Sequence, residues 1–160
     1  KGTSNASNWI KGMVSNINQP FYSGDTSLIR AVGQGKCGIG VVNHYYLARM
    51  QAGQSGRKDQ SLASSIKLIM PNPAHVNISA AGLAASAKNK AEAIQLIEYL
   101  ASPTGSDALA GPTYEYPLRG FGTSAELKAF GSVNPDNVPI SKLGSTQKKA
   151  IQIMAQNGWQ

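Results

Sequence analysis

Residues 37–50, with the sequence CGIGVVNHYYLARM, decide the fold and contain the candidate site. The apolar run Cys37–Val42 predicts a short buried strand, and Cys37 within it is expected to be an inert, buried thiol. Asn43 is a typical N-cap residue, so a helix is expected over His44–Met50. The stretch therefore predicts a strand followed directly by a helix, as in α/β proteins.

The same kind of succession continues on both sides of this stretch. Strands are few for so many helices, which indicates that part of a sheet is missing. In the helix that begins near Asn89, Ala91, Ile94, Ile97 and Ala101 fall on one stripe. In the last helix, Ile151 and Met154 are expected to face inward. The expected helices are 25–33, 89–101, 105–110, 124–130 and 145–157, the strands are 66–70 and 75–79, and a Gly/Ser/Gln-rich loop covers 51–65.

Composition and charge exclude several classes of protein. The chain has 160 residues, 41% of them hydrophobic, one Cys and a formal net charge of +7. A disulfide scaffold needs more cysteines, and no apolar run approaches the roughly 20 residues of a membrane helix. The first ten residues contain no apolar signal segment, so the chain is expected to be mature, processed or a fragment. Lys and Arg are scattered, which favours a solvated basic surface over specific nucleic-acid binding.

Patterns typical of catalytic sites are absent. No Gly-x-Ser-x-Gly elbow occurs, no phosphate-binding glycine loop joins a strand to a helix, and zinc-ligand spacing is missing. His75 alternates with apolar residues and is interpreted as a hydrogen-bonded structural histidine. We therefore predict no catalytic residues and a protein that is not an enzyme.

Two adjacent tyrosines at the start of the expected helix form the most informative cluster. Side chains of neighbouring helical residues diverge by about 100°, so burying both Tyr45 and Tyr46 in one core is difficult, whereas both can line a cleft. A trivalent cation stabilises phenolate, and the positive end of the helix supports the same ionisation. Arg49 lies one turn further on, where its charge can compensate a phenolate. The alternative is an aromatic packing pair with exposed hydroxyls.

Several spaced motifs then resemble the ferric-iron-binding proteins of ABC importers, and most of all their cyanobacterial branch. They follow one another in the same order and cover nearly the whole chain. They are GDT (24–26), GKCGIGVVNHYYLAR (35–49), HVNISAAG (75–82), YLASP (99–103), YEYP (114–117) and NGW (157–159).

This resemblance implies an α/β fold of the type II periplasmic-binding-protein class, of which the chain is the C-terminal half. Such proteins bind Fe(III) in the periplasm between two lobes and deliver it to an ABC permease in the inner membrane. By the resemblance, Tyr45 and Tyr46 are metal ligands, and Arg49 and Asn43 support them from beside the metal. Water or a synergistic anion would complete the coordination of Fe(III).

Family members are about twice as long as this chain, and the resemblance implies a division of its residues between lobes. Residues 1–76 and 118–160 would belong to the C-terminal lobe, and 77–117 would cross the hinge and add helices to the N-terminal lobe. The missing N-terminal half would supply the remaining ligands. Two alternatives stay open: a carrier of a small anion or organic solute, held near 25–27 or Asn43, and a basic protein that binds nucleic acid or anionic surfaces.

Overall fold

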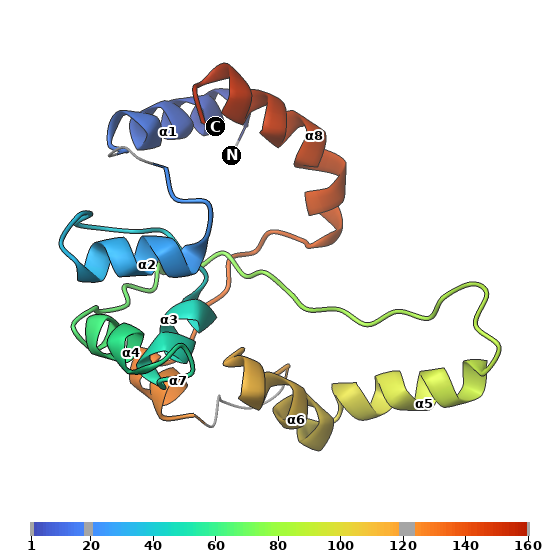
Figure 1. Ribbon diagram of the computed structural model, residues 1–160. Helices are drawn as coiled ribbons and strands as arrows, with labels where there is room; N and C mark the ends of the chain where they lie inside the picture. Colours follow the sequence, from blue (N-terminus) through green and yellow to red (C-terminus); the bar gives the residue numbers. More distant parts are fainter. Residues whose placement is uncertain (1, 18–20, 119–123, 160) are drawn as a thin grey trace. The chain divides into compact units, whose positions relative to one another are not determined.

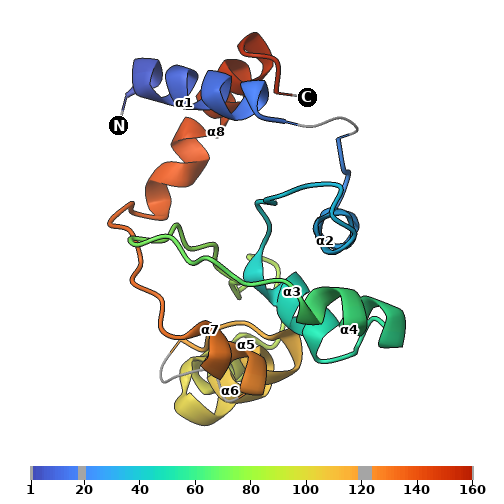
Figure 2. The same cartoon turned by 90° about the vertical axis from the view of Figure 1, so that its left-hand side faces the viewer.

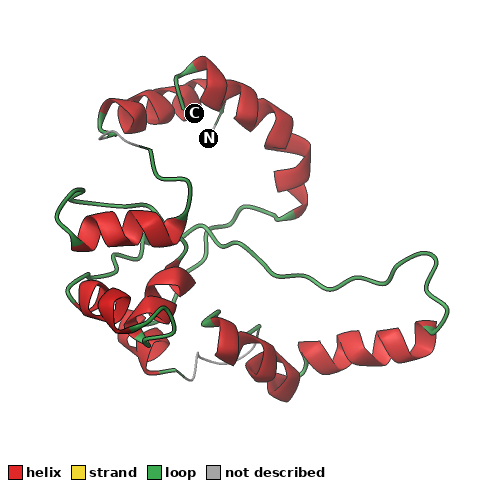
Figure 3. Ribbon diagram, viewed as in Figure 1, coloured by secondary structure: helices red, strands yellow, loops and turns green. Residues whose placement is uncertain are grey.

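The computed structural model describes residues 2–17, 21–118 and 124–159. Helices joined by loops make up the described part of the chain, which contains no β-strand (Figures 1 and 3). Two compact units are present, one of residues 1–22 and 137–160 and the other of residues 23–136. The helices are α1 (Thr3–Ser15), α2 (Asp25–Gly33), α3 (His44–Gln51), α4 (Arg57–Ser64), α5 (Lys90–Ala101), α6 (Pro103–Thr113), α7 (Ala125–Phe130) and α8 (Ser141–Gln156).

A small apolar core holds α2, α3 and α4 together in the unit of residues 23–136. Its buried members are Ile29 of α2, Leu47 and Met50 of α3 and Ala63 of α4, and Phe130 of α7 packs against them. Leu47 and Met50 lie three residues apart, on the same side of their helix, as an amphipathic helix requires. This core fixes the orientation of α3, on which the candidate site is built.

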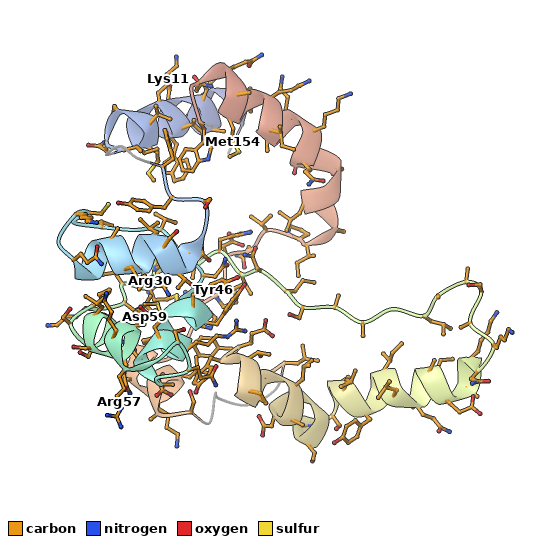
Figure 4. The ribbon with its side chains drawn as sticks, viewed as in Figure 1. Lys11, Arg30, Tyr46, Arg57, Asp59 and Met154 are labelled. Atoms are coloured by element: carbon orange, nitrogen blue, oxygen red, sulfur yellow. The ribbon has the colours of Figure 1, made fainter. Side chains whose placement is uncertain are left out.

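Helix α4 lies within residues 51–65, which the sequence analysis expected to be a loop, and that prediction is wrong. The buried carboxylate of Asp59 accepts hydrogen bonds from Nε and Nη2 of Arg30, at 2.8 and 2.6 Å. Figure 4 shows Arg30 of α2 and Asp59 of α4 facing each other. Short helices are stabilised by such tertiary contacts more than by intrinsic helix propensity. The amino-acid composition of residues 51–65 does not reveal the contact with α2, so it does not predict the helix.

Extended backbone replaces the three expected strands. Residues 37–42, 66–70 and 75–79 form no ladder with any described segment, and an isolated parallel bridge joins Ala74 to Pro135. A strand needs a partner for its backbone N–H and C=O groups, and no neighbouring segment supplies one. The prediction of strands at these three segments is therefore wrong for the described part of the chain.

The expected burial of the 37–42 segment is also wrong. Ile39 and Val41 are 82% and 70% exposed, and Ile69 of the next extended segment is 80% exposed. The thiol of Cys37 is only half-buried. Gly40 does lie against α2, since an added Cβ would come within 3.0 Å of Leu28. Val42 also packs against the core, so the expected burial is wrong for Ile39 and Val41 and is partly met where α2 and the core cover Gly40 and Val42.

Helices α5 and α6 follow each other directly and pack on one another (Figure 1). Ser102 and Pro103 end α5, as expected, and they also begin α6: the Ser102 hydroxyl accepts the Gly105 N–H at 3.1 Å, and Pro103 is the first helical residue. Helix α6 is accordingly longer than the expected 105–110. No residue of α5 is fully buried: in the stripe from Ala91 to Ala101, Ile97 is half-buried and the other three residues are exposed.

The unit of residues 1–22 and 137–160 contains α1 and α8, which lie side by side (Figures 1 and 2). Helix α1 is not predicted from the sequence, and α8 begins at Ser141, four residues before its expected start. Ile10 and Ile153 are the buried residues of the pair, whereas Ile151, expected to face inward, is exposed and Met154 is half-buried. Ser7 donates a hydrogen bond to Asn157 at 3.0 Å. No helix in the described ranges is both long enough and apolar enough to cross a membrane.

Candidate metal centre

The tyrosine pair lies in the first turn of α3, a helix that packs against the apolar core. Asn43 is the N-cap residue with extended backbone, and α3 begins at His44, as predicted. Leu47, Ala48 and Met50 are buried, and the ring of Tyr46 packs against the same core (Figure 4). The phenols are thus carried by a helix whose rotation is set by apolar packing.

The rings of Tyr45 and Tyr46 lie together, and Arg49 lies over both. The ring centroids are 4.6 Å apart with an interplanar angle of 36°. The guanidinium carbon of Arg49 is 5.0 Å from the Tyr45 centroid and 5.6 Å from that of Tyr46. The structure therefore brings these three predicted site residues into one cluster.

The surroundings of Tyr45 act on the ionisation of its phenol. Desolvation raises the pKa of Tyr45, the neighbouring Tyr46 and the carboxylate of Asp25 raise it further, and Arg49 opposes them. Without a cation, Tyr45 is consequently a neutral phenol at neutral pH. A metal ion that binds the phenolate has to displace this proton.

Residues 113–116, far away in the sequence, pack against the same helix. His44 Nε2 donates a hydrogen bond to the Tyr114 carbonyl at 3.0 Å, and Arg49 Nη2 donates one to the Thr113 carbonyl at 3.3 Å. The His44 ring lies 5.1 Å from that of Tyr116, and burial lowers the pKa of His44, so the ring is neutral. The sequence analysis did not place these residues beside the tyrosines, because no local pattern connects α3 with a segment 70 residues later.

Asn43 is held from two sides. Its backbone N–H and its Nδ2 both donate to Oδ2 of Asp25, at 3.2 and 2.9 Å. Its Oδ1 accepts a hydrogen bond from Nδ2 of Asn77 at 3.0 Å. The fourth predicted site residue therefore lies at the start of α3 as expected, but its hydrogen bonds go to two other segments and its side chain does not cap its own helix.

This arrangement offers oxygen donors from phenols. Within the described ranges no three or more His, Cys, Asp or Glu side chains gather as a metal-ligand cluster. Phenolate is a hard anionic donor, which suits a trivalent cation better than it suits zinc or copper. His75 has its Nδ1 3.1 Å from Oδ2 of Asp136, which confirms it as a hydrogen-bonded histidine.

Comparisons with known proteins point to iron carriers. No family model matches the chain. Iron uptake proteins A1 and A2 of Synechocystis are 32% and 33% identical to it over 94% and 95% of its length. An Fe(3+)-binding periplasmic protein of Serratia marcescens is 27% identical over 94% of the chain. None of these names describes an enzyme, in agreement with the prediction from the sequence.

Solved structures show the same likeness. A Bordetella ferric binding protein covers 96% of the chain with a TM-score of 0.88 and 32% identity. Ferric iron-binding protein A of Mannheimia haemolytica, in an open conformation, covers 98% with a TM-score of 0.88 and 25% identity. The fold is thus that of half of a type II periplasmic binding protein, the class that the sequence predicts.

The chain matches only part of the length of each relative. The chain spans 43%, 46% and 44% of the three curated relatives and 50% of each solved structure. This agrees with the interpretation of the chain as one half of such a protein. By sequence and by fold, the chain is a homologue of one half of the iron-uptake and ferric-iron-binding proteins.

Proposed function

We propose that the chain is part of a periplasmic substrate-binding protein that binds Fe(III) through the phenolates of Tyr45 and Tyr46 and delivers it to an ABC permease in the inner membrane. The observation that carries this proposal is the close approach of two tilted phenol rings in the first turn of a helix anchored by the core, with the Arg49 guanidinium over both rings. A fixed cation beside two phenols favours their ionised forms once a metal replaces the protons.

Two phenolates fill part of the coordination shell of Fe(III). The chain spans less than half of its curated relatives, so we propose that the remaining ligands come from the half that it lacks, and that water or an anion fills any open position. Support for such a partner comes from Ile39, Val41 and Ile69, whose exposed side chains lie on extended segments without strand partners. Strands of the missing half would cover them.

We also propose that residues 77–117 belong to the opposite lobe of the complete protein. The segment leaves the neighbourhood of α3 at Asn77 and returns to it at Tyr114. Between these points α5 buries no residue, and α6 is its packing partner. If residues 77–117 belong to another lobe, their apolar stripe would be exposed as long as the rest of that lobe is absent. The exposed stripe on α5 therefore supports the proposal.

The main alternative is a carrier of a small anion at the N-terminus of α3. One observation disfavours it: the N–H and the amide group of Asn43 are already bonded to the carboxylate of Asp25. An incoming anion would have to displace a carboxylate of like charge from these donors.

Competition with citrate tests the proposal through affinity. Fe(III) is titrated into the chain and into the Tyr45→Phe/Tyr46→Phe double variant, with Tyr99→Phe on exposed α5 as a control for the loss of a phenol elsewhere. We expect the double variant to lose iron to citrate concentrations at which the wild type and the control retain it. Equal retention by the double variant and the wild type would contradict the proposal.

A further inference from the structure

The carboxylate of Asp25 lies where α2 meets the start of the tyrosine helix. Asp25 is the first residue of α2, and its Oδ2 accepts both the backbone N–H and the side-chain amide of Asn43, eighteen residues later in the chain. Hydrogen bonds to an ionised carboxylate are about twice as strong as neutral ones. The contact is partly buried, so water competes for it less than it would at an open surface.

The partners of Asn43 make it a junction between three segments. An N-cap asparagine usually accepts an N–H of its own helix, but here Oδ1 accepts from Asn77 in the extended segment. Asp25 therefore holds Asn43 from α2 while Asn77 holds it from the other side. The rotamer of Asn43 and the backbone direction that enters α3 are both determined by these contacts.

The first turn of α3 depends on the conformation of Asn43, the residue at which the chain enters the helix. The Tyr46 N–H donates to the Asn43 carbonyl at 3.2 Å, and Tyr45 lies between the two residues in the chain. The negative charge of Asp25 also lies at the positive end of the α3 dipole, where it is stabilising. A change in the direction of the chain at Asn43 would consequently move both phenols.

We propose that Asp25 is a positioning residue of the candidate metal centre, which acts through its two hydrogen bonds to Asn43 and does not touch the metal. The inference rests on the proposed function of Tyr45 and Tyr46, to which it adds a residue of another helix. Two phenols can chelate one ion only if their oxygens start from a suitable separation, and the Asp25–Asn43 contact fixes the turn that carries them.

A double-mutant cycle on Fe(III) affinity tests the proposal. The variants are Asp25→Ala, Asn43→Ala and their combination, and Asp107→Ala on exposed α6 controls for the loss of one negative charge. We expect each single variant to weaken Fe(III) binding by about 10–100-fold, as for other residues that orient metal ligands. The loss of affinity in the combination should be smaller than the sum of the two single losses, because both substitutions remove the hydrogen bond from Nδ2 of Asn43 to Asp25. Asp25→Asn, which keeps one acceptor oxygen, should recover part of the affinity.

The spectrum of bound iron separates positioning from general destabilisation. A displaced phenolate changes the energy of the visible charge-transfer band or its intensity per bound iron, whereas a merely weakened fold lowers the loaded fraction and leaves both of these quantities unchanged. Wild-type affinity and an unchanged band in Asp25→Ala would overturn the proposal. So would single-variant effects that simply add in the combination.

A metal-free measurement keeps the test independent of the proposed function. Amide exchange is recorded for Leu47, whose N–H lies in the first turn of α3, and for Ile29 and Ala63 of the core. We expect faster exchange at Leu47 in Asp25→Ala with unchanged core amides. If the wild type binds no Fe(III), the proposed function fails, and this measurement alone decides the role of Asp25. Unchanged exchange at Leu47 would then refute it.

Discussion

At the residue scale, Arg49 connects the chemistry of the tyrosine pair with the fold. Its guanidinium lies over both phenol rings and also donates to the Thr113 carbonyl. A cation on an aromatic face is attracted to the ring and stabilises a phenolate more strongly still. The same side chain therefore anchors the 113–116 segment and lowers the pKa of Tyr45 against the influences that raise it.

Removing the charge of Arg49 should raise the pKa of Tyr45. Arg49 lowers this pKa in the wild type, against desolvation and the neighbouring Tyr46 and Asp25. In Arg49→Gln the phenolate loses its nearest cation, so the metal-free chain should need a higher pH to ionise this phenol. Ultraviolet absorption of phenolate during a pH titration measures the change. Arg49→Lys, which keeps a charge, serves as the control, and a lower pKa in Arg49→Gln would contradict the expectation.

At the element scale, a charged pair between helices adds to the apolar contacts that hold α4. Asp59 is buried on α4, and both of its oxygens accept from Arg30 of α2. These hydrogen bonds are the main cause that lowers the pKa of Asp59. The helix is thus attached to its neighbours through a contact whose strength depends on pH.

The stability of the α2–α4 core should therefore fall in acid. The pKa of Asp59 is lowered in the folded chain, so the unfolded chain binds more protons in acid. The contribution of Asp59 to the free energy of unfolding is complete above its unfolded pKa of about 4. It is lost as the pH falls through the folded pKa. Urea unfolding at several pH values should show a smaller loss of stability between neutral and acidic pH in Asp59→Asn than in the wild type.

Asp107→Asn, an exposed carboxylate of α6, is the control for this experiment and should keep the acid sensitivity of the wild type. Equal acid sensitivity in Asp59→Asn and the wild type would show that the Arg30–Asp59 pair does not hold α4.

The junction of α5 and α6 depends on a glycine. A Cβ on Gly105 would collide with the Tyr99 carbonyl oxygen and would lie 2.9 Å from the Leu100 Cα. Gly105→Ala should therefore push α5 away from α6, with loss of helical circular dichroism and of amide protection in both helices. A Cβ added at Gly111 of α6 would have no neighbouring atom within 4 Å. Gly111→Ala should be stabilising by roughly 0.5–1 kcal/mol.

At the scale of the whole molecule, most helices could be predicted from the sequence and the sheet could not. Helices α2, α3, α5 and α7 follow from caps and apolar spacing within a few residues of each. The segment 37–42 has the composition of a strand, but pairing requires a second strand, which no described residue provides. Likewise, the pairing of Tyr45 with Tyr46 is local and was predicted, whereas the contacts of His44 with Tyr114 and of Asn43 with Asp25 depend on the tertiary fold.

The isolated chain should be partly folded and prone to association. Helix α5 buries no residue, and Ile94, Leu96 and Tyr99 on it are 46%, 57% and 50% exposed. At about 25 cal/mol per Å², such an exposed apolar surface favours self-association. Size-exclusion chromatography and amide exchange measure this. A monomer with uniformly protected amides over residues 77–117 would show that this segment needs no other lobe.

Resonance Raman spectroscopy of the iron-loaded chain tests the central claim most directly, because it identifies the atoms that bind the metal. If Tyr45 and Tyr46 are ligands, excitation in the visible charge-transfer band should enhance phenolate ring vibrations. Each of Tyr45→Phe and Tyr46→Phe should weaken them, and the double variant should abolish them. Tyr99→Phe should leave them unchanged. Iron that binds the wild type without enhanced phenolate vibrations, or vibrations that persist in the double variant, would contradict the account.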